Sequence, residues 1–520
     1  MSTCPILGPF LNEGPGPALF LAILWPLAGA LLVGLASRLP NLRDTLSFLT
    51  ALSLFAFVVT IILPAGRGSG DVSHDILEVL PGLTLRLRLE PLGLLFALVA
   101  SGLWIITSLY AVGYMRGHGE KHQTRFAICF ALAIAGALGV AFAGNVFTLF
   151  VFYEAITIST YPLVTHAGTE QARRSGRLYL GILMGTSVAF LLLALAWTWH
   201  LAGTTEFTPG GILAGKASPA VLTALLALYA FGTGKAALMP FHRWLPAAMV
   251  APTPVSALLH AVAVVKAGVF TVVKVIVYIF GLDLMHEIGG DQWLAWVAAF
   301  TMLSAACVAL SKDNLKARLA YSTISQLAYI VFGAALATDH AVLGSALHIA
   351  MHAFGKITLF FCAGAILVAT HKSKVSELAG LGRRMPFTFG AFTLGAFSII
   401  GLPPLGGSWS KWYLALGTMD VGDAGDAGGS GRPLMLGVLL LSSLLAVGYL
   451  MPVIVTAFFG QAEEDKQHSG HGSHGNQSEG GLREAPLLCV LPPVVSALGC
   501  LALFYYADEL VTILKGALLP

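Results

Sequence analysis

The stretch LLALYAFGTGKAALMPFHRWLP (residues 225–246) combines a long apolar run with a central lysine, Lys235, and with prolines that follow it. Proline removes a backbone donor and bends or breaks a helix. In a lipid bilayer such a break is tolerated where the freed backbone lines a cavity or packs inside protein. A second stretch, LPPLGGSWSKWYLALG (residues 402–417), places Lys411 after prolines and glycines in a similar way. We therefore expect two broken membrane helices, each with a lysine near its break.

The whole chain has the composition of a membrane protein. Of its 520 residues, 57% are hydrophobic and 11% are charged, whereas a soluble domain carries about 25% charged residues. The net charge is +3, and no basic tract is interleaved with aromatic residues, which argues against nucleic acid binding. The six cysteines are scattered without a CxxC pair. We therefore expect no iron–sulfur cluster, no zinc site and no cofactor bound by this chain.

Apolar runs divide the chain into about fourteen predicted membrane helices, because a helix needs about 20 apolar residues to cross the hydrocarbon core. Lipid cannot satisfy open backbone groups, so the predicted fold class is an all-α polytopic membrane protein. The runs begin near Ala18, Asp44, Pro91, Arg125, Asn145, Arg177, Ala220, Thr253, Trp293, Arg318, Ala341, Pro386, Leu434 and Ala485.

The two broken helices are the seventh and the twelfth, which are five helices apart. Paired interruptions in corresponding halves are typical of repeats that enclose an ion path. Helices 4–8 and 9–13 are therefore predicted to be two repeats, and an odd number of helices gives them opposite orientations in the membrane. The predicted domains are N-terminal helices 1–3 (residues 1–120), the first repeat (121–281), the second repeat (282–460), a His-rich loop (461–484), and helix 14 with a tail (485–520).

Lysine and arginine are far more frequent in the loops after odd-numbered helices than in the loops after even-numbered ones. The positive-inside rule places the lysine- and arginine-rich loops in the cytoplasm. Both termini are then predicted outside the cytoplasm, in a multi-pass protein of the bacterial inner (cell) membrane. The cytoplasmic loop 461–484 contains His468, His471 and His474. These histidines could bind a metal or sense pH, but a flexible solvated loop is the favoured interpretation.

Several charged residues lie in the middle of predicted spans. Such a charge costs about 2.5–3.5 kcal/mol on insertion scales, so each is a functional hypothesis. The alternative is that these charges form static ion pairs between helices, but one clear acid cannot pair with four lysines. Lys274 lies nearer a span end, and its side chain is interpreted as reaching toward the interface. The residues in mid-span are Glu154, Lys235, Lys266, Lys356 and Lys411.

Histidines accompany these lysines. His348, His352 and Lys356 are spaced i, i+4, i+8 and share one helix face, and His260 precedes Lys266 by less than two turns. Imidazole titrates near neutral pH, and a lysine taken out of water gives up its proton more readily, unless a carboxylate pairs with it. The set therefore predicts a proton relay. A polar stripe in residues 321–329 either lines a hydrated path or joins helices, and both interpretations stay open.

Four motifs resemble the antiporter-like subunits shared by respiratory complex I, membrane-bound group 4 hydrogenases and Mrp cation/proton antiporters. The resemblance covers roughly residues 90–460. It implies fourteen core helices, inverted five-helix repeats, broken helices seven and twelve, and partner subunits in a hetero-oligomeric complex. The motifs are GKAALMPFHRWLPAAMVAPTPVSALLHAVAVVKAGVF (234–270), DNLKARLAYSTISQLAYI (313–330), HIAMHAFGKITLFFCAGAI (348–366) and GLPPLGGSWSKWYL (401–414).

The resemblance also implies which residues carry protons. The twelfth-helix position is lysine in some members of the family and glutamate in others. The matched positions are Glu154 on the fifth helix, Lys235 on the seventh, His260 and Lys266 on the eighth, His348, His352 and Lys356 on the eleventh, and Lys411 on the twelfth.

The twelfth-helix lysine, the chain length and the context SWSKWYLALG (408–417) are most similar to the D subunit of an Mrp antiporter. The predicted function is therefore the proton-translocating subunit of a monovalent cation (Na⁺)/proton antiporter, which is not an enzyme by itself. One alternative is a proton-pumping membrane-arm subunit of a complex I-like NADH dehydrogenase or a group 4 hydrogenase. Another is a subunit that couples proton flow to inorganic carbon uptake. The expected partners are other membrane subunits, the lipid bilayer, protons and a monovalent cation.

Overall fold

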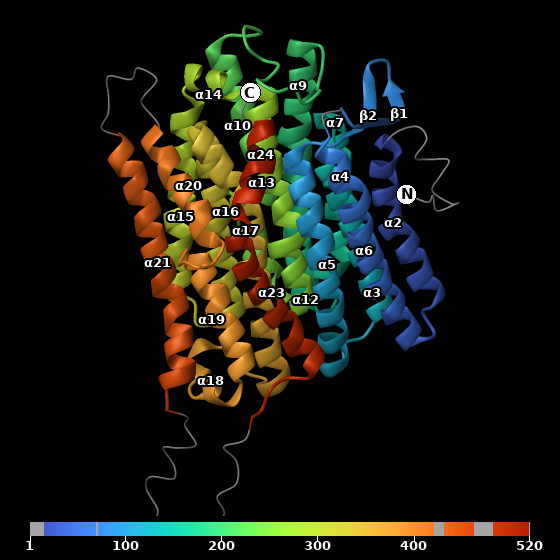
Figure 1. Ribbon diagram of the computed structural model, residues 1–520, viewed down its shortest axis with the longest axis vertical. Helices are drawn as coiled ribbons and strands as arrows, with labels where there is room; N and C mark the ends of the chain where they lie inside the picture. The colour runs from blue at the N-terminus through green and yellow to red at the C-terminus, as the bar shows by residue number, and fades with distance from the viewer. Residues whose placement is uncertain (1–14, 69–70, 421–430, 462–481, 519–520) are drawn as a thin grey trace, which may run out of the picture.

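The computed structural model describes residues 15–68, 71–420, 431–461 and 482–518. They form a bundle of long helices that run between two ends of the molecule (Figure 1). Among the described residues, twelve helical segments are long and apolar enough to cross a membrane. They are α2 (Gly16–Leu35), α3 (Pro40–Phe57) with α4 (Leu63–Gly66), α5 (Pro91–Gly117), α6 (Gln123–Ala141), α7 (Val146–Val164), α8 (Glu170–Thr186) with α9 (Leu192–Ala202), α12 (Thr253–Ala257) with α13 (Val264–Val275), α15 (Gly290–Ser311), α16 (Leu315–Leu336), α17 (Asp339–Thr370), α21 (Gly431–Phe459) and α23 (Leu487–Tyr505).

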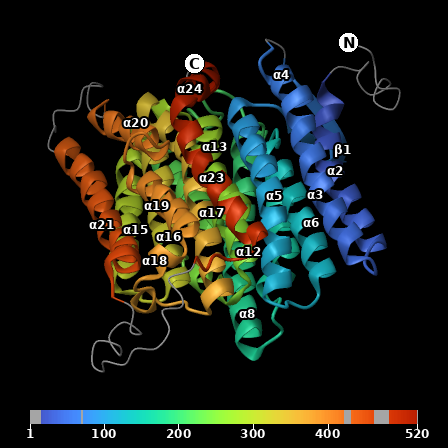
Figure 2. The ribbon, with the colours of Figure 1, turned by 60° about the horizontal axis from the view of Figure 1, so that its bottom comes forward.

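These bounds confirm the predicted spans, most of them within a few residues. The sixth span begins at Glu170, seven residues before its predicted start. Its first two turns carry charged residues and project beyond the bundle (Figure 2), so hydropathy alone missed them. The two remaining predicted spans are the interrupted ones.

Both predicted breaks are present. In the seventh span, α10 (Pro219–Gly232) gives way to a short 3-10 turn (Gly234–Ala236) and to α11 (Trp244–Ala247). In the twelfth span, α19 (Pro386–Ile400) is separated from α20 (Gly407–Asp420) by an irregular segment that begins at Gly401, whose φ is +96°. Each break contains a cis prolyl bond, at Met239–Pro240 and at Pro403–Pro404.

The two broken spans run in opposite directions. In Figure 1, α10 lies at one end of the bundle and the following α12 lies toward the other, whereas α19 lies toward that other end and α20 returns toward the first. This arrangement is the one that two inverted five-helix repeats require. The domain limits drawn from the sequence stay a prediction.

One hairpin was not expected in an all-α fold. Strands β1 (Ser73–Leu80) and β2 (Leu83–Arg88) pair antiparallel in the loop after the second span. The segment LTLRLR of β2 alternates apolar and polar residues, which is the period of a strand. Arg86 donates two hydrogen bonds to Asp75 across the hairpin, and these bonds hold the pKa of the Asp75 carboxyl below its ordinary value. We call the end of the bundle that carries this hairpin the hairpin end.

The C-terminal tail is also structured. It forms α24 (Ala507–Leu518), which lies toward the hairpin end across the front of α17 (Figures 1 and 2). The core is centred on the eighth, tenth and eleventh spans. The 18 most apolar consecutive residues of the segment Thr253–Phe280 are all buried, whereas only 33% of the corresponding residues of Pro40–Gly66 are buried. The span that carries His260 and Lys266 is therefore enclosed by the rest of the bundle.

Glu484, which precedes α23, anchors the start of α19. Its carboxylate accepts the backbone N–H groups of Phe387 and Thr388 at 2.8 and 3.2 Å, and also the Thr388 hydroxyl. We expect Glu484→Ala to destabilise the protein by about 1 kcal/mol, the usual cost of losing a helix N-terminal cap. Thermal denaturation of the purified protein measures this change. The exposed Glu287 supplies the matched control, because Glu287→Ala should leave the transition where it was, and equal shifts in both variants would contradict this role.

Candidate functional site

All eight predicted residues lie on the central helices or at the breaks, with most of them removed from solvent. Glu154 and Lys411 are half-buried. The other six are at most 1% exposed: Lys235, His260, Lys266, His348, His352 and Lys356.

The break in the seventh span presents Lys235 to α7. Lys235 Nζ donates to the Tyr153 carbonyl oxygen (2.8 Å) and to Thr157 Oγ1 (2.6 Å), and it lies 3.1 Å from the centroid of the Tyr153 ring. The Lys235 backbone N–H donates to the Tyr153 hydroxyl at 3.0 Å. Trp244 fixes the turn by donating its indole N–H to the Gly234 carbonyl at 3.0 Å. Neutral groups alone therefore hold this ammonium through hydrogen bonds.

Glu154 follows Tyr153 on α7, about 100° further around the helix. Neither of its carboxylate oxygens has a hydrogen-bond partner among the described residues, and both are buried. Lys235 takes Tyr153 and Thr157 as partners instead. Glu154 and Lys235 therefore make no direct ion pair at this break in the described structure.

Lys266, in the first predicted repeat, contacts His352, in the second. Lys266 Nζ on α13 lies 2.7 Å from His352 Nδ1 on α17. His352 stacks on His348 with ring centroids 5.8 Å apart, as their i, i+4 spacing predicts. His348 Nδ1 then lies 2.8 Å from Ser410 Oγ on α20. A row of titratable and hydroxyl groups thus runs from the eighth span to the twelfth.

The Lys356 side chain is not part of this row. Its Nζ donates to Ser322 Oγ on α16 and lies 3.5 Å from the Leu319 carbonyl oxygen. Ser322 in turn donates to the Tyr449 hydroxyl on α21 at 3.0 Å. The spacing placed Lys356 on the face shared with the two histidines, but its long side chain reaches the neighbouring helix instead.

Lys411 sits directly at the second break. Its Nζ donates to the Ile400 carbonyl (2.9 Å), which the end of α19 leaves free, and to Ser443 Oγ (3.0 Å). The Tyr329 ring lies between this lysine and the histidines, 4.8 Å from Lys411 Nζ and 5.6 Å from the ring of His348. The Tyr329 hydroxyl also lies 3.2 Å from Ser443 Oγ.

The polar stripe joins helices, and the hydrated path stays a prediction. Ser322 and Tyr329 join α16 to α21, and the same groups contact Lys356 and Lys411. Sequence patterns did not indicate the partner side chains on the other helices, because their contacts depend on which helices are neighbours. These partners are Tyr153, Thr157, Ser410, Ser443 and Tyr449.

His260 is buried beside this row without joining it. Its ring lies 4.6 Å from the ring of Phe360, centroid to centroid, and neither ring nitrogen has a hydrogen-bond partner among the described residues. The Nε2 atoms of His348 and His352 are also buried without a partner there. Buried polar atoms are normally hydrogen-bonded, so these nitrogens are exceptions to the rule.

Lys274 is not an interfacial side chain, which corrects the prediction. It is fully buried, and its Nζ lies 3.0 Å from Glu90 Oε2 and donates to the Ala143 carbonyl. Glu90 directly precedes the third span. The sequence indicates Glu154 as the one clear buried acid, and Glu90 is a second.

A metal site is not found within the described ranges, where no group of three or more His, Cys, Asp or Glu side chains could hold an ion. His468, His471 and His474 lie outside the described residues.

Comparison with known proteins shows which proteins this chain is similar to. A family model described as "NADH:quinone oxidoreductase/Mrp antiporter, TM" matches residues 143–424, a range that includes all eight predicted positions. NADH-quinone oxidoreductase subunit N of Desulforudis audaxviator is 34% identical over 386 residues, 72% of this chain and 73% of that protein. The A/B component of a probable K(+)/H(+) antiporter from Rhizobium meliloti is 32% identical over 398 residues, 75% of this chain and 38% of that protein. A chain in the solved Mrp complex from Dietzia sp. DQ12-45-1b shares the fold with a TM-score of 0.82 at 23% identity, over 97% of each chain.

Proposed function

Because the chain belongs to the family of membrane subunits shared by NADH:quinone oxidoreductases and Mrp antiporters, we propose that it is the proton-translocating subunit of a multisubunit monovalent cation/proton antiporter, similar to the D subunit of Mrp antiporters. The observation that carries the proposal is the 2.7 Å contact between Lys266 and His352. It joins the helices of the two predicted repeats through two groups that can each bind and release a proton.

The first half of the path runs from Lys235 to Lys266. Gly268, on the same helix as Lys266, packs so closely on the backbone of Lys235 and Ala236 that a β-carbon there would collide with it. The seventh-span break and α13 are thus in direct contact. Hydroxyl partners such as Thr157 can accept a hydrogen bond from the ammonium or donate one to the neutral amine, so Lys235 keeps a partner in both protonation states. Glu154 supplies the acid at this end.

The second half runs from His352 through His348 to Lys411, with Tyr329 and Ser443 between the last two. A proton that reaches His352 from Lys266 can pass to His348 and then toward the Lys411 break. Lys356 is a side branch that contacts the Ser322 hydroxyl on α16, and Ser322 in turn contacts the Tyr449 hydroxyl on α21. We propose that the hairpin end faces away from the cytoplasm, in agreement with the distribution of lysine and arginine among the loops.

His348 offers a test of the second half. We expect His348→Gln to lower proton flux several-fold and to flatten its pH dependence, because glutamine can hydrogen-bond Ser410 but cannot titrate. Flux measured across a pH series in vesicles that contain the purified complex gives both quantities. A profile identical to that of the unmodified complex would remove His348 from the path.

A second candidate is the membrane arm of a redox-driven proton pump. The similarity to an NADH-quinone oxidoreductase subunit favours it, and the same buried residues would carry protons under a different driving force. Purification of the native complex through a tag on this chain, followed by identification of its subunits, separates the two. Small membrane subunits without flavin, iron–sulfur or nickel partners support the antiporter. Redox partners would overturn it in favour of the pump.

A further inference from the structure

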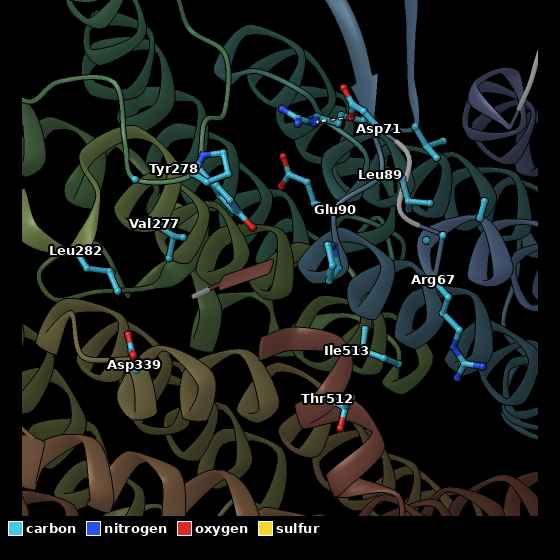
Figure 3. A pocket seen from close by; sticks show the side chains of 18 of the residues that line it. Arg67, Asp71, Leu89, Glu90, Val277, Tyr278, Leu282, Asp339, Thr512 and Ile513 are labelled. Atoms are coloured by element: carbon cyan, nitrogen blue, oxygen red, sulfur yellow. Dashed lines mark hydrogen bonds and ion pairs between the residues drawn. The ribbon is translucent and has the colours of Figure 1, made fainter. Parts of the chain in front are cut away.

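An open cavity of about 1220 Å³ lies at the hairpin end (Figure 3). Its wall is formed by α4, the segments before β1 and before α5, residues 209–210, the segment after α13, the start of α17, and α24. Carboxylates gather on this wall from five separate segments: Asp71, Glu90, Asp283, Asp339 and Glu509. Arg67, Arg88 and His286 line the same cavity, and the Arg88 guanidinium lies 3.0 Å from Asp71. A cavity of this size admits water.

Glu90 connects this cavity to the interior. Figure 3 shows its carboxylate and the Tyr278 side chain projecting into the same space. Glu90 is only 7% exposed, and the same carboxylate lies 3.0 Å from Lys274 Nζ, which is fully buried. Behind the pair, Lys274 also contacts the Ala143 carbonyl and lies 4.3 Å from the Phe207 ring centroid. One ion pair therefore has its acid at the cavity wall and its base inside the protein.

Lys274 and the relay share a helix. Lys274 follows Lys266 by eight residues on α13, which is a rise of about 12 Å. Phe270 lies between them, with its ring centroid 5.6 Å from Lys274 Nζ. Lys274 thus lies on α13 between the cavity and the Lys266–His352 contact, and Glu90 pairs with it at the cavity wall.

We propose that the Glu90–Lys274 pair is a proton-exchange site between the hairpin-end cavity and Lys266, an inference that rests on the proposed function. For inward passage, the Glu90 carboxylate takes one proton from cavity water and becomes a neutral acid. The Lys274 ammonium, no longer paired with a negative charge, gives its proton to water on the Lys266 side. Glu90 then returns its proton to the Lys274 amine, so that one proton has moved and the pair is restored. The reverse order releases a proton to the cavity.

A static ion pair that only holds α5 against α13 is the competing explanation, and a double variant separates the two. Glu90→Gln with Lys274→Met removes both charges, and replacing a buried pair by neutral side chains is often harmless to stability, whereas removing one partner is not. If pairing alone mattered, the double variant would assemble and transport normally. We expect it to assemble at the normal level while proton flux in vesicles falls at least ten-fold.

The controls separate this inference from the proposed function. Glu287→Gln makes the same change at an exposed carboxylate that does not line the cavity, and it should leave flux unchanged. Lys235→Ala is measured alongside. Loss of flux in Lys235→Ala together with normal flux in the double variant overturns the exchange site and leaves the proposed function standing. Absence of proton flux in the unmodified complex overturns the proposed function itself.

A measurement on the unmodified complex covers the case in which the double variant does not assemble. A water-soluble carbodiimide is added to the hairpin side of the vesicles, and adducts are mapped by mass spectrometry. We expect an adduct on Glu90 and a loss of flux that follows its formation. Full modification of Glu90 with flux unchanged, or flux blocked with Glu90 unmodified, contradicts the exchange site.

Discussion

Lys235→Ala is expected to abolish proton flux, by more than 100-fold, while leaving the complex assembled. The lysine is fully buried and is held by the Tyr153 carbonyl and the Thr157 hydroxyl rather than by a carboxylate. Lys235 makes no direct ion pair among the described residues, so its removal does not break one. The proton carrier at the seventh-span break is lost instead. A removed proton-transfer group typically costs about 10²–10⁴-fold in rate.

Two further variants sharpen this result. Lys235→Arg keeps the positive charge but cannot release a proton under physiological conditions, so it should be as inactive as Lys235→Ala. The exposed Lys372 supplies the control, and Lys372→Ala should transport normally. Flux is measured with a pH-sensitive dye in vesicles, and assembly by size-exclusion chromatography. Loss of the assembled complex in Lys235→Ala would favour a structural role for this lysine, and normal flux in Lys235→Arg would contradict its role as a proton carrier.

His352→Phe is the second substitution with a large expected effect. His352 is in contact with Lys266 at 2.7 Å and stacks on His348, so the substitution interrupts the link between the two repeats. Phenylalanine keeps a planar ring in the stack and removes both nitrogens. We expect flux to fall at least ten-fold with assembly retained, because no described group replaces the link between Lys266 and His348.

The flux assay and the assembly measurement used for Lys235 check this prediction. His200, which is exposed near the end of α9, supplies the matched control, because His200→Phe makes the same chemical change away from the relay. Normal flux in His352→Phe would mean that protons bypass α17. That result would leave the two repeats working as separate channels.

The membrane spans could be predicted from the sequence because each depends only on local composition. The lysines at the breaks were found for the same reason, since Lys235 and Lys411 stand beside prolines and glycines in otherwise apolar runs. The i, i+4 pairing of His348 and His352 also follows from helix geometry alone. The hairpin at residues 73–88 was missed because its strands are short and lie between longer apolar signals.

Contacts between helices could not be predicted in this way. The Lys266–His352 contact, the place of Tyr329 between His348 and Lys411, and the turn of Lys356 toward Ser322 depend on which helices are neighbours. Composition does not encode that arrangement. Glu90 is an example. It lies at the edge of a span, and the sequence does not indicate that Lys274 is 3.0 Å away.

Proton movement by the purified native complex, in vesicles without any electron donor, tests the proposed function most directly. A sodium or potassium gradient is imposed across the membrane, and the internal pH is followed with a dye. The relay proposed for these buried lysines and histidines predicts a pH change that depends on the cation gradient and disappears in Lys235→Ala. A complex that moves protons only when an electron donor is supplied would contradict antiport and identify a redox-driven pump.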